Sequence, residues 1–205
     1  MSKAKSGVTA DFVLPIVVLV LICAVMSGLL AVTNNITAPI IEEAERAANE
    51  AARKEVLSAA DSFEKVDAAG LPDAVTEVYR ATNGAGYTFS ITAQGYGGKG
   101  TLKIAVGIDM DGKMTGTYVL DHKETAGLGS KITTDAFQGQ FPGQDAGYVS
   151  DIKNIDAIGG ATRSSNFFRL ALTYAFEAFD MVNDPAALND GSGDPDFAVD
   201  PAKEG

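Results

Sequence analysis

The sequence feature that most constrains this chain is a long apolar run near its N-terminus. From Phe12 to Val32 the sequence is apolar, interrupted only by Pro15, Ser27 and Gly28. About twenty such residues are enough to cross the hydrocarbon core of a bilayer as a helix. A cleaved signal peptide is the alternative, since Ala31-Val32-Thr33 resembles a weak cleavage site. The run is longer than the usual signal-peptide core of about 7–15 apolar residues, so we expect a membrane anchor.

Basic residues are distributed unevenly around the apolar run. Lys3 and Lys5 precede it, whereas Arg46 is the only basic residue close behind it and lies among glutamates. Because Lys and Arg favour the cytoplasmic side of a membrane, we expect residues 1–11 to be a cytoplasmic N-terminus. Residues 12–33 are then a single transmembrane helix, and the chain that follows is extracytoplasmic.

A second helix is predicted directly after the anchor. Thr37-Ala38-Pro39 combines a capping hydroxyl with a proline in the first turn, which is typical of a helix start. Alanine-rich sequence continues to about Ala60, with Glu42/Arg46 and Glu50/Lys54 at the i,i+4 spacing of stabilising ion pairs. We expect residues 34–60 to form a stalk helix that carries a domain away from the membrane. Its small-sided apolar face leaves open an added contact with other subunits.

Residues 61–182 have the pattern of one domain. Residues 61–73 are polar and are expected to be a connection. Apolar residues then alternate in several short segments, most clearly at residues 102–108, and Asp111-Gly112 indicates a hairpin turn. Strands are expected at residues 76–80, 86–92, 102–108 and 115–120, and a short helix around residues 134–137. We therefore predict an α+β fold with a mostly antiparallel sheet and flanking helices.

Composition excludes several kinds of site. The net charge of −11 disfavours nucleic-acid binding, which needs a basic face to neutralise phosphates. His122 is the only histidine, and Cys23, the only cysteine, lies in the apolar run. A histidine-rich metal site, a disulfide framework and a cysteine-ligated iron–sulfur cluster within the chain are therefore excluded. Residues 183–205 are acidic and poor in apolar residues, which predicts a disordered tail.

Two glycine-rich segments carry the residues that indicate a function. The first is Asp156-Ala157-Ile158-Gly159-Gly160-Ala161-Thr162, followed by helical spacing of apolar residues from about Ser164 to Met181. Its small residues allow a ligand close to the backbone, and the start of the helix favours an anion such as phosphate. Alone, this is also the pattern of an ordinary helix entry. The second segment, His122-Lys123-Glu124-Thr125-Ala126-Gly127-Leu128-Gly129, follows a predicted strand.

Together the two segments resemble the FMN-binding domain of the G subunit of the Rnf electron-transport complex. The related C subunit of the sodium-pumping NADH:quinone reductase shares it, and the likeness runs from about Asn34 to Met181. In that family an Asp-x-x-Ser/Thr/Gly-Gly-Ala-Thr segment is the signal for a flavin transferase, which esterifies the threonine hydroxyl with the phosphate of FMN. The resemblance implies that Thr162 carries covalent FMN. The rest of the signal maps to Asp156, Gly159, Gly160 and Ala161.

The second segment matches the family's His-x-Glu-Thr-Pro-Gly-Leu-Gly pattern. It maps to His122, Glu124, Thr125, Ala126, Gly127, Leu128 and Gly129, with Ala126 in place of the usual proline. We expect Glu124, Thr125 and the N–H groups of Gly127 to Gly129 to meet the polar edge of the flavin ring. His122 either contacts the flavin or orients its own loop through a hydrogen bond with the backbone.

Three further side chains have two interpretations each. Tyr96 either stacks on the flavin ring or is an ordinary core or surface aromatic. Lys131 and Arg163 either offset the charge of the phosphate or lie at the surface. A serine-type hydrolase built on Thr162, Ser164 and His122 is not expected, because no nucleophile-elbow motif surrounds these hydroxyls.

The resemblance implies an electron-carrying subunit of a complex that couples ferredoxin–NAD electron transfer to ion movement. Such a subunit is not an enzyme alone. Its implied partners are the other membrane and iron–sulfur subunits, a flavin transferase during maturation, and membrane lipid. The C subunit of the sodium-pumping reductase is an alternative, although its chains usually run longer. A membrane-anchored binding module without redox turnover is a third possibility.

Overall fold

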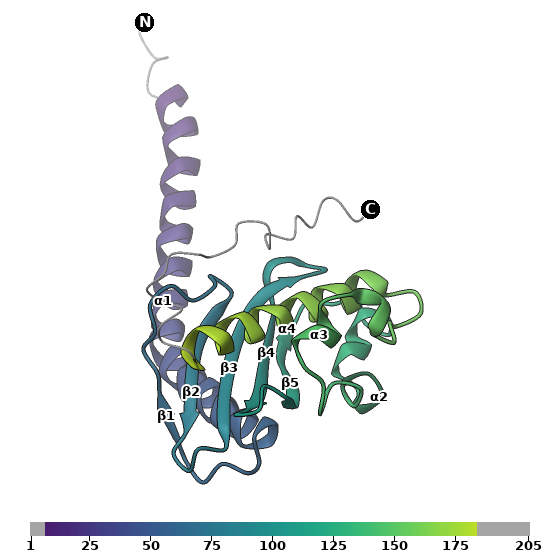
Figure 1. Cartoon of the computed structure of the whole chain (residues 1–205). Coiled ribbons are helices and arrows are strands. Elements are labelled where there is room, and N and C mark those ends of the chain that lie inside the picture. The colour runs from purple at the N-terminus through teal and green to yellow at the C-terminus, as the bar shows by residue number, and fades with distance from the viewer. Residues whose placement is uncertain (1–6, 184–205) are drawn as a thin grey trace, which may run out of the picture. The chain divides into compact units, whose positions relative to one another are not determined.

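The computed structural model describes residues 7–183 of the chain (Figure 1). Most of the expected cytoplasmic segment and nearly all of the expected acidic tail lie outside these residues. The chain divides into two compact units, residues 1–48 and residues 49–205. The first consists of most of one long helix, and the second contains the end of that helix and the whole of the sheet.

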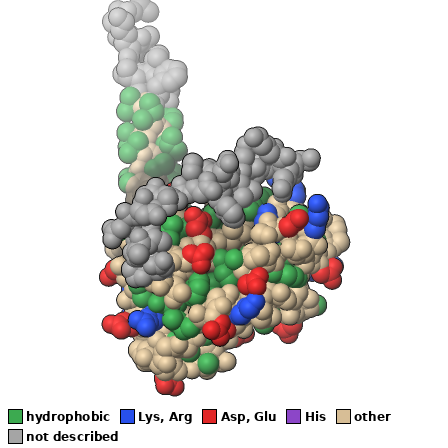
Figure 2. Space-filling view, in the orientation of Figure 1, with side chains coloured by type: hydrophobic (Ala, Val, Ile, Leu, Met, Phe, Trp, Pro, Cys, Tyr) green, Lys and Arg blue, Asp and Glu red, His purple; other side chains and the backbone are tan. Residues whose placement is uncertain are grey.

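The N-terminal unit is formed by helix α1 (Gly7–Val56), which continues into the second unit. Its large apolar side chains between Val13 and Ile41 are exposed, and Figure 2 shows apolar side chains along the visible side of the helix. Among residues 7–183, α1 is the one helix long and apolar enough to cross a membrane. These properties fit a single-pass membrane protein.

The predicted helix start at Thr37 is wrong. The helix runs through Thr37 and contains both Pro15 and Pro39. The Thr37 hydroxyl donates to the carbonyl oxygen of Thr33, one turn back, at 2.9 Å, so it does not cap a forward N–H group. A proline in a helix removes one backbone hydrogen bond, and here the helix is continuous on both sides of it. The stalk and the anchor are therefore one helix.

The second unit is built on a five-stranded antiparallel sheet whose strands lie in sequence order. The strands are β1 (Phe63–Lys65), β2 (Val75–Ala81), β3 (Gly86–Gly95), β4 (Gly98–Asp109) and β5 (Met114–His122). The predicted α+β class with an antiparallel sheet is confirmed. Strand β1 was not expected, because the segment at residues 61–73 was interpreted as a connection.

Helix α4 (Thr162–Asn183) covers one face of this sheet (Figure 1). Alternate residues of β3 and β4, such as Phe89 and Ile104, point into the core that α4 closes with Phe168, Leu172 and neighbouring residues. Burial of one such side chain contributes about 1.5–3 kcal/mol. Since the C-terminal helix supplies one wall of the core, its first turn is held firmly beside the sheet.

Short helices connect β5 to α4. They are η1 (Gly129–Thr133), α2 (Asp135–Gln138), α3 (Ala146–Val149) and η2 (Ile152–Asn154). Helix α2 confirms the short helix expected around residues 134–137. Its Phe137 packs edge-on against Phe141 and Phe168, with ring centroids 5.4 and 5.3 Å away. These aromatic contacts attach the connecting segment to the core.

The last two turns of α1 pack on the opposite face of the sheet. Val56 lies against Gly107 and Gly116, where a Cβ on either glycine would crowd the Val56 backbone. The Thr115 hydroxyl donates to the carbonyl oxygen of Val56. Arg53, also buried, lies 3.9 Å above the ring of Tyr79. Residues 49–56 thus belong to the sheet domain by packing, although the sequence analysis placed them in the stalk.

Candidate functional site

Both glycine-rich segments meet at one cleft. The cleft has a volume of about 430 Å³. Its walls come from the β3–β4 turn, the loop after β5 and the start of α4, and are formed by Tyr96, Thr125, Leu128, Gly129, Gly160, Ala161, Thr162, Arg163 and Ser164. Residues as far apart in the sequence as Tyr96 and Ser164 are therefore neighbours here.

Thr162 is the first residue of α4, exposed to solvent and on the cleft wall. The turn before it depends on Gly160, whose φ of +78° is a left-handed conformation that favours glycine. Ala161 N–H closes the turn by donating to the Ile158 carbonyl at 2.9 Å. The buried hydroxyl of Ser165 accepts from Ile158 N–H at 3.0 Å. These contacts hold the backbone that carries Thr162.

The start of α4 also offers backbone donors. The first intrahelical hydrogen bond of this region runs from Ser165 N–H to the Ala161 carbonyl, at 3.1 Å. The preceding N–H groups, those of Thr162, Arg163 and Ser164, have no acceptor among the described residues. With the positive end of the helix dipole, such groups suit a phosphate. The predicted helix start was Ser164, two residues later than observed.

Two residues of the predicted attachment signal lie outside the cleft wall. Asp156 has an exposed side chain and a fixed backbone: its N–H donates to Gln140 Oε1 at 2.8 Å, and Gln140 Nε2 donates to its carbonyl at 3.4 Å. Gly159 is exposed, and a Cβ on it would meet nothing within 4 Å. The serine or threonine that is commoner at this position of the signal would therefore fit without a clash.

Glu124 does not line the cleft, although its neighbours do. Its Oε1 accepts from Tyr96 N–H at 2.7 Å, and its Oε2 accepts from the Ser164 hydroxyl at 2.5 Å. The expected contact of Glu124 with the flavin ring stays a prediction, but its carboxylate already has two donors. Ser164 was missed as a member of the site because its partner is distant in sequence.

His122 contacts the backbone of Glu124. Its Nδ1 accepts a hydrogen bond from Glu124 N–H at 3.2 Å, and its side chain is not part of the cleft surface. The structure thus contains the loop-orienting bond that was one of two expectations for His122. Gly127, with φ of +77°, also lies off the cleft surface and donates to the Ser130 hydroxyl at 2.9 Å.

Of the three side chains with two interpretations each, two line the cleft and one does not. Tyr96 is 60% exposed and lines the cleft, so its ring is available to a ligand. Arg163 also lines the cleft, and its guanidinium carbon lies 5.8 Å from the ring centroid of Phe167. Lys131 is exposed and lies outside the cleft surface.

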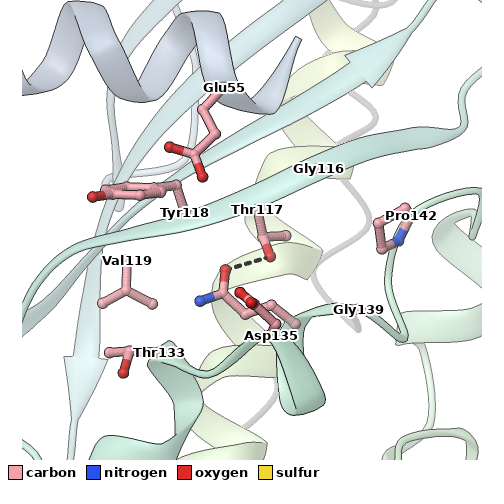
Figure 3. A pocket seen from close by; sticks show the side chains of 10 residues that line it. Glu55, Gly116, Thr117, Tyr118, Val119, Thr133, Asp135, Gly139 and Pro142 are labelled. Carbon is pink, nitrogen blue, oxygen red and sulfur yellow. Dashed lines mark hydrogen bonds between the residues drawn. The ribbon is translucent and has the colours of Figure 1, made fainter. Parts of the chain in front are cut away.

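A second cleft lies on another part of the domain (Figure 3). It has a volume of about 340 Å³. Its walls come from the end of α1, the edge strand β5 and the segment around α2, where the Thr117 hydroxyl donates to Gln138 Oε1 at 2.9 Å. Glu55 and Asp135 are its charged lining residues. None of the predicted site residues lines it, so the first cleft is the candidate site.

Comparison with protein families matches two parts of the chain. A model of the FMN-binding domain matches residues 95–177, which include both glycine-rich segments. A model of the RnfG N-terminal region matches residues 17–56, which lie within α1.

Three curated relatives cover most of the chain, and each is the G subunit of a complex. The G subunit of the ion-translocating oxidoreductase complex of Methanosarcina acetivorans is 35% identical over 159 residues, which are 73% of this chain and 85% of the relative. The G subunit of the Na(+)-translocating ferredoxin:NAD(+) oxidoreductase complex of Acetobacterium woodii is 35% identical, covering 81% and 90%. The G subunit of the proton-translocating ferredoxin:NAD(+) oxidoreductase complex of Clostridium ljungdahlii is 30% identical, covering 72% and 80%.

Proposed function

The chain belongs to the family of G subunits of ion-translocating oxidoreductase complexes, and from this membership we propose how its cleft works. It is the electron-carrying G subunit of an Rnf-type ferredoxin:NAD+ oxidoreductase complex, and not an enzyme alone. Its FMN is attached to Thr162 through a phosphoester. FMN in a protein supplies reversible electron transfer, and the protein supplies its position and surroundings.

The position of Thr162 carries the proposal. Thr162 lies on the cleft wall at the start of α4, where N–H groups without an acceptor among residues 7–183 suit the phosphate of FMN. Gly160 and Ala161 leave the backbone accessible there. The cleft volume falls within the range of about 300–1,000 Å³ that is usual for small-molecule sites. A covalent tether keeps the carrier from dissociating between electron transfers.

The remaining cleft residues would hold the flavin ring. Tyr96 and Leu128 offer exposed apolar side chains to the cleft, and Thr125 and Gly129 also line it. Asp156 and Gly159 have a different role in the proposal. Since they are exposed and lie outside the cleft, they present the attachment signal to a flavin transferase during maturation.

The membrane placement follows from α1 and the charges before it. Helix α1 spans the membrane once, Lys3 and Lys5 keep residues 1–11 in the cytoplasm, and the flavin domain is extracytoplasmic. The partners are membrane lipid and the other membrane and iron–sulfur subunits of the complex. The match of α1 to the N-terminal region of G subunits favours this assignment over the C subunit of the sodium-pumping reductase.

The attachment is tested on a denaturing gel. The chain is produced with a flavin transferase, quenched in acid, separated and examined for flavin fluorescence. Wild type and Thr133→Ala, which removes an exposed hydroxyl outside the flavin cleft, are expected to fluoresce, and Thr162→Ala is expected to be dark. Fluorescence that persists in Thr162→Ala would reject the attachment site. A dark wild type would favour the binding module without redox turnover.

A further inference from the structure

One carboxylate connects all three walls of the flavin cleft without facing it. Glu124 belongs to the segment after β5, its Oε1 accepts from Tyr96 N–H in the β3–β4 turn, and its Oε2 accepts from the Ser164 hydroxyl in the first turn of α4. The two bonds are 2.7 and 2.5 Å long. The carboxylate therefore joins the β3–β4 turn to the first turn of α4 through one hydrogen bond on each of its oxygens.

Two glycines, Gly95 and Gly129, leave space for this carboxylate. A Cβ on Gly95 would lie 2.6 Å from Oε1, and a Cβ on Gly129 would lie 2.7 Å from Oε2. The Gly129 Cβ would also lie 2.5 Å from the Ser164 hydroxyl. Neither glycine has a left-handed φ, so close approach to Glu124 explains them better than backbone strain does. The half-buried carboxylate therefore lies close against both glycines.

The Glu124 carboxylate has no ion-pair partner among the described residues. The three ion pairs of residues 7–183 lie elsewhere and do not include Glu124. An amide and a hydroxyl stabilise it instead, and both belong to residues that line the cleft. The group is thus bound to the cleft walls themselves, which is the arrangement expected of a residue that sets their separation.

We propose that Glu124 is a positioning residue: it fixes the distance between the Tyr96 turn and the first turn of α4, and so orients the flavin ring relative to Thr162 without touching it. This inference rests on the proposed function. It differs from direct contact between the carboxylate and the flavin, because it requires only an acceptor for Tyr96 N–H and a hydrogen-bond partner for Ser164.

The test uses the full chain in detergent, produced with a flavin transferase. Glu124→Ala, Glu124→Gln and Ser164→Ala are compared with wild type. Asp121→Asn serves as the control because Asp121 is an exposed carboxylate near the end of β5, the strand that precedes Glu124. Covalent flavin per chain is measured after denaturation. Visible circular dichroism and fluorescence anisotropy of the attached flavin then report how firmly the ring is held in the folded protein.

The variants are expected to differ in how firmly they hold the flavin ring. Glu124→Ala keeps Thr162 and so still acquires flavin, but ring docking weakens about tenfold per lost hydrogen bond, which lowers both optical signals. Glu124→Gln restores them, because its oxygen accepts from Tyr96 and its amide donates to Ser164. Ser164→Ala is intermediate, and the double variant Glu124→Ala/Ser164→Ala is no worse than Glu124→Ala.

Other outcomes overturn the inference. If Glu124→Ala gives wild-type signals, the carboxylate does not position the ring. If Glu124→Gln is as poor as Glu124→Ala, the charge itself is needed and direct contact is favoured. Should Glu124→Ala fail to fold, Ser164→Ala with unchanged signals would still refute the link. Absence of covalent flavin from wild type and Asp121→Asn is distinct from these results and removes the proposed function as well.

Discussion

Gly107 offers a quantitative test of how the end of α1 joins the sheet domain. In Gly107→Ala the new Cβ would overlap the Val56 carbonyl oxygen and the Thr115 hydroxyl, and it would meet Val56 backbone atoms that cannot turn aside. Overpacking of this kind costs about 1–3 kcal/mol. Displacement of the Thr115–Val56 hydrogen bond costs about 0.5–1.5 kcal/mol more.

A smaller stabilising effect opposes this loss of stability. Replacing glycine by alanine reduces the entropy of the unfolded chain, which stabilises the fold by about 0.4–1 kcal/mol. We therefore expect Gly107→Ala to lower the free energy of unfolding by about 0.5–4 kcal/mol, with a central value of about 2 kcal/mol. Gly116→Ala is the graded comparison, because its Cβ would lie 3.2 Å from Val56 atoms and small shifts can relieve the contact. Its expected loss is about 1 kcal/mol or less.

The matched control is Gly159→Ala. A Cβ there meets nothing within 4 Å and the backbone is not left-handed, so stability should stay equal or rise by less than about 1 kcal/mol. The assay is urea unfolding of the detergent-solubilised chain, followed by the fluorescence of its six tyrosines. A Gly107→Ala loss below about 0.5 kcal/mol, or one no larger than that of Gly159→Ala, would refute the packing of residues 49–56 on the sheet.

Three further predictions concern the attachment segment and the surface. Gly160→Ala forces alanine into a left-handed conformation, so it should cost about 1 kcal/mol or more in urea unfolding and lower flavin attachment on the gel. Gln140→Leu removes both hydrogen bonds to the Asp156 backbone, so flavin attachment should slow. Circular dichroism should show that the core stays folded. An unchanged rate of flavin attachment would contradict this prediction. The hydrogen bond from Lys113 lowers the pKa of Asp145 below its usual 3.8, so its stabilising effect is present above that pH and is lost as the pH falls through the lowered pKa. Asp145→Asn should therefore be less stable than wild type at neutral pH, with the difference disappearing in acid unfolding titrations.

Much of the sheet could be predicted because its pattern is local. Leu102, Ile104, Val106 and Ile108 alternate along β4 and are all buried, so the side-chain period alone identified the strand. β1 has three residues, Phe63–Lys65, none of them buried, and its pairing with β2 is a long-range contact. A segment this short and exposed carries no period from which a strand can be predicted.

Local signals also misled the prediction at Thr37. A threonine before Pro39 is typical of a helix start, but the same hydroxyl can bond one turn back inside a continuous helix. The sequence around it does not distinguish these two states, since both place apolar residues at helical spacing. The resulting separate stalk helix was an error of boundary and not of secondary structure.

The candidate site likewise contains residues that the sequence predicts and one that it does not. Thr162 and Gly160 belong to one contiguous motif, so the sequence identified them, and the structure brings them beside Thr125 and Leu128 from the second motif. The bond between Glu124 and Ser164 joins residues forty positions apart and connects the motifs. No local pattern contains such a contact, which is why Ser164 could be identified only from the fold.

The most direct test of the covalent flavin is the intact mass of the full chain, purified from cells that contain a flavin transferase. The expected mass is that of the polypeptide plus FMN less one water, with the added mass on the peptide that contains Thr162. An unmodified mass, or an addition on a peptide without Thr162, would contradict the proposed electron carrier.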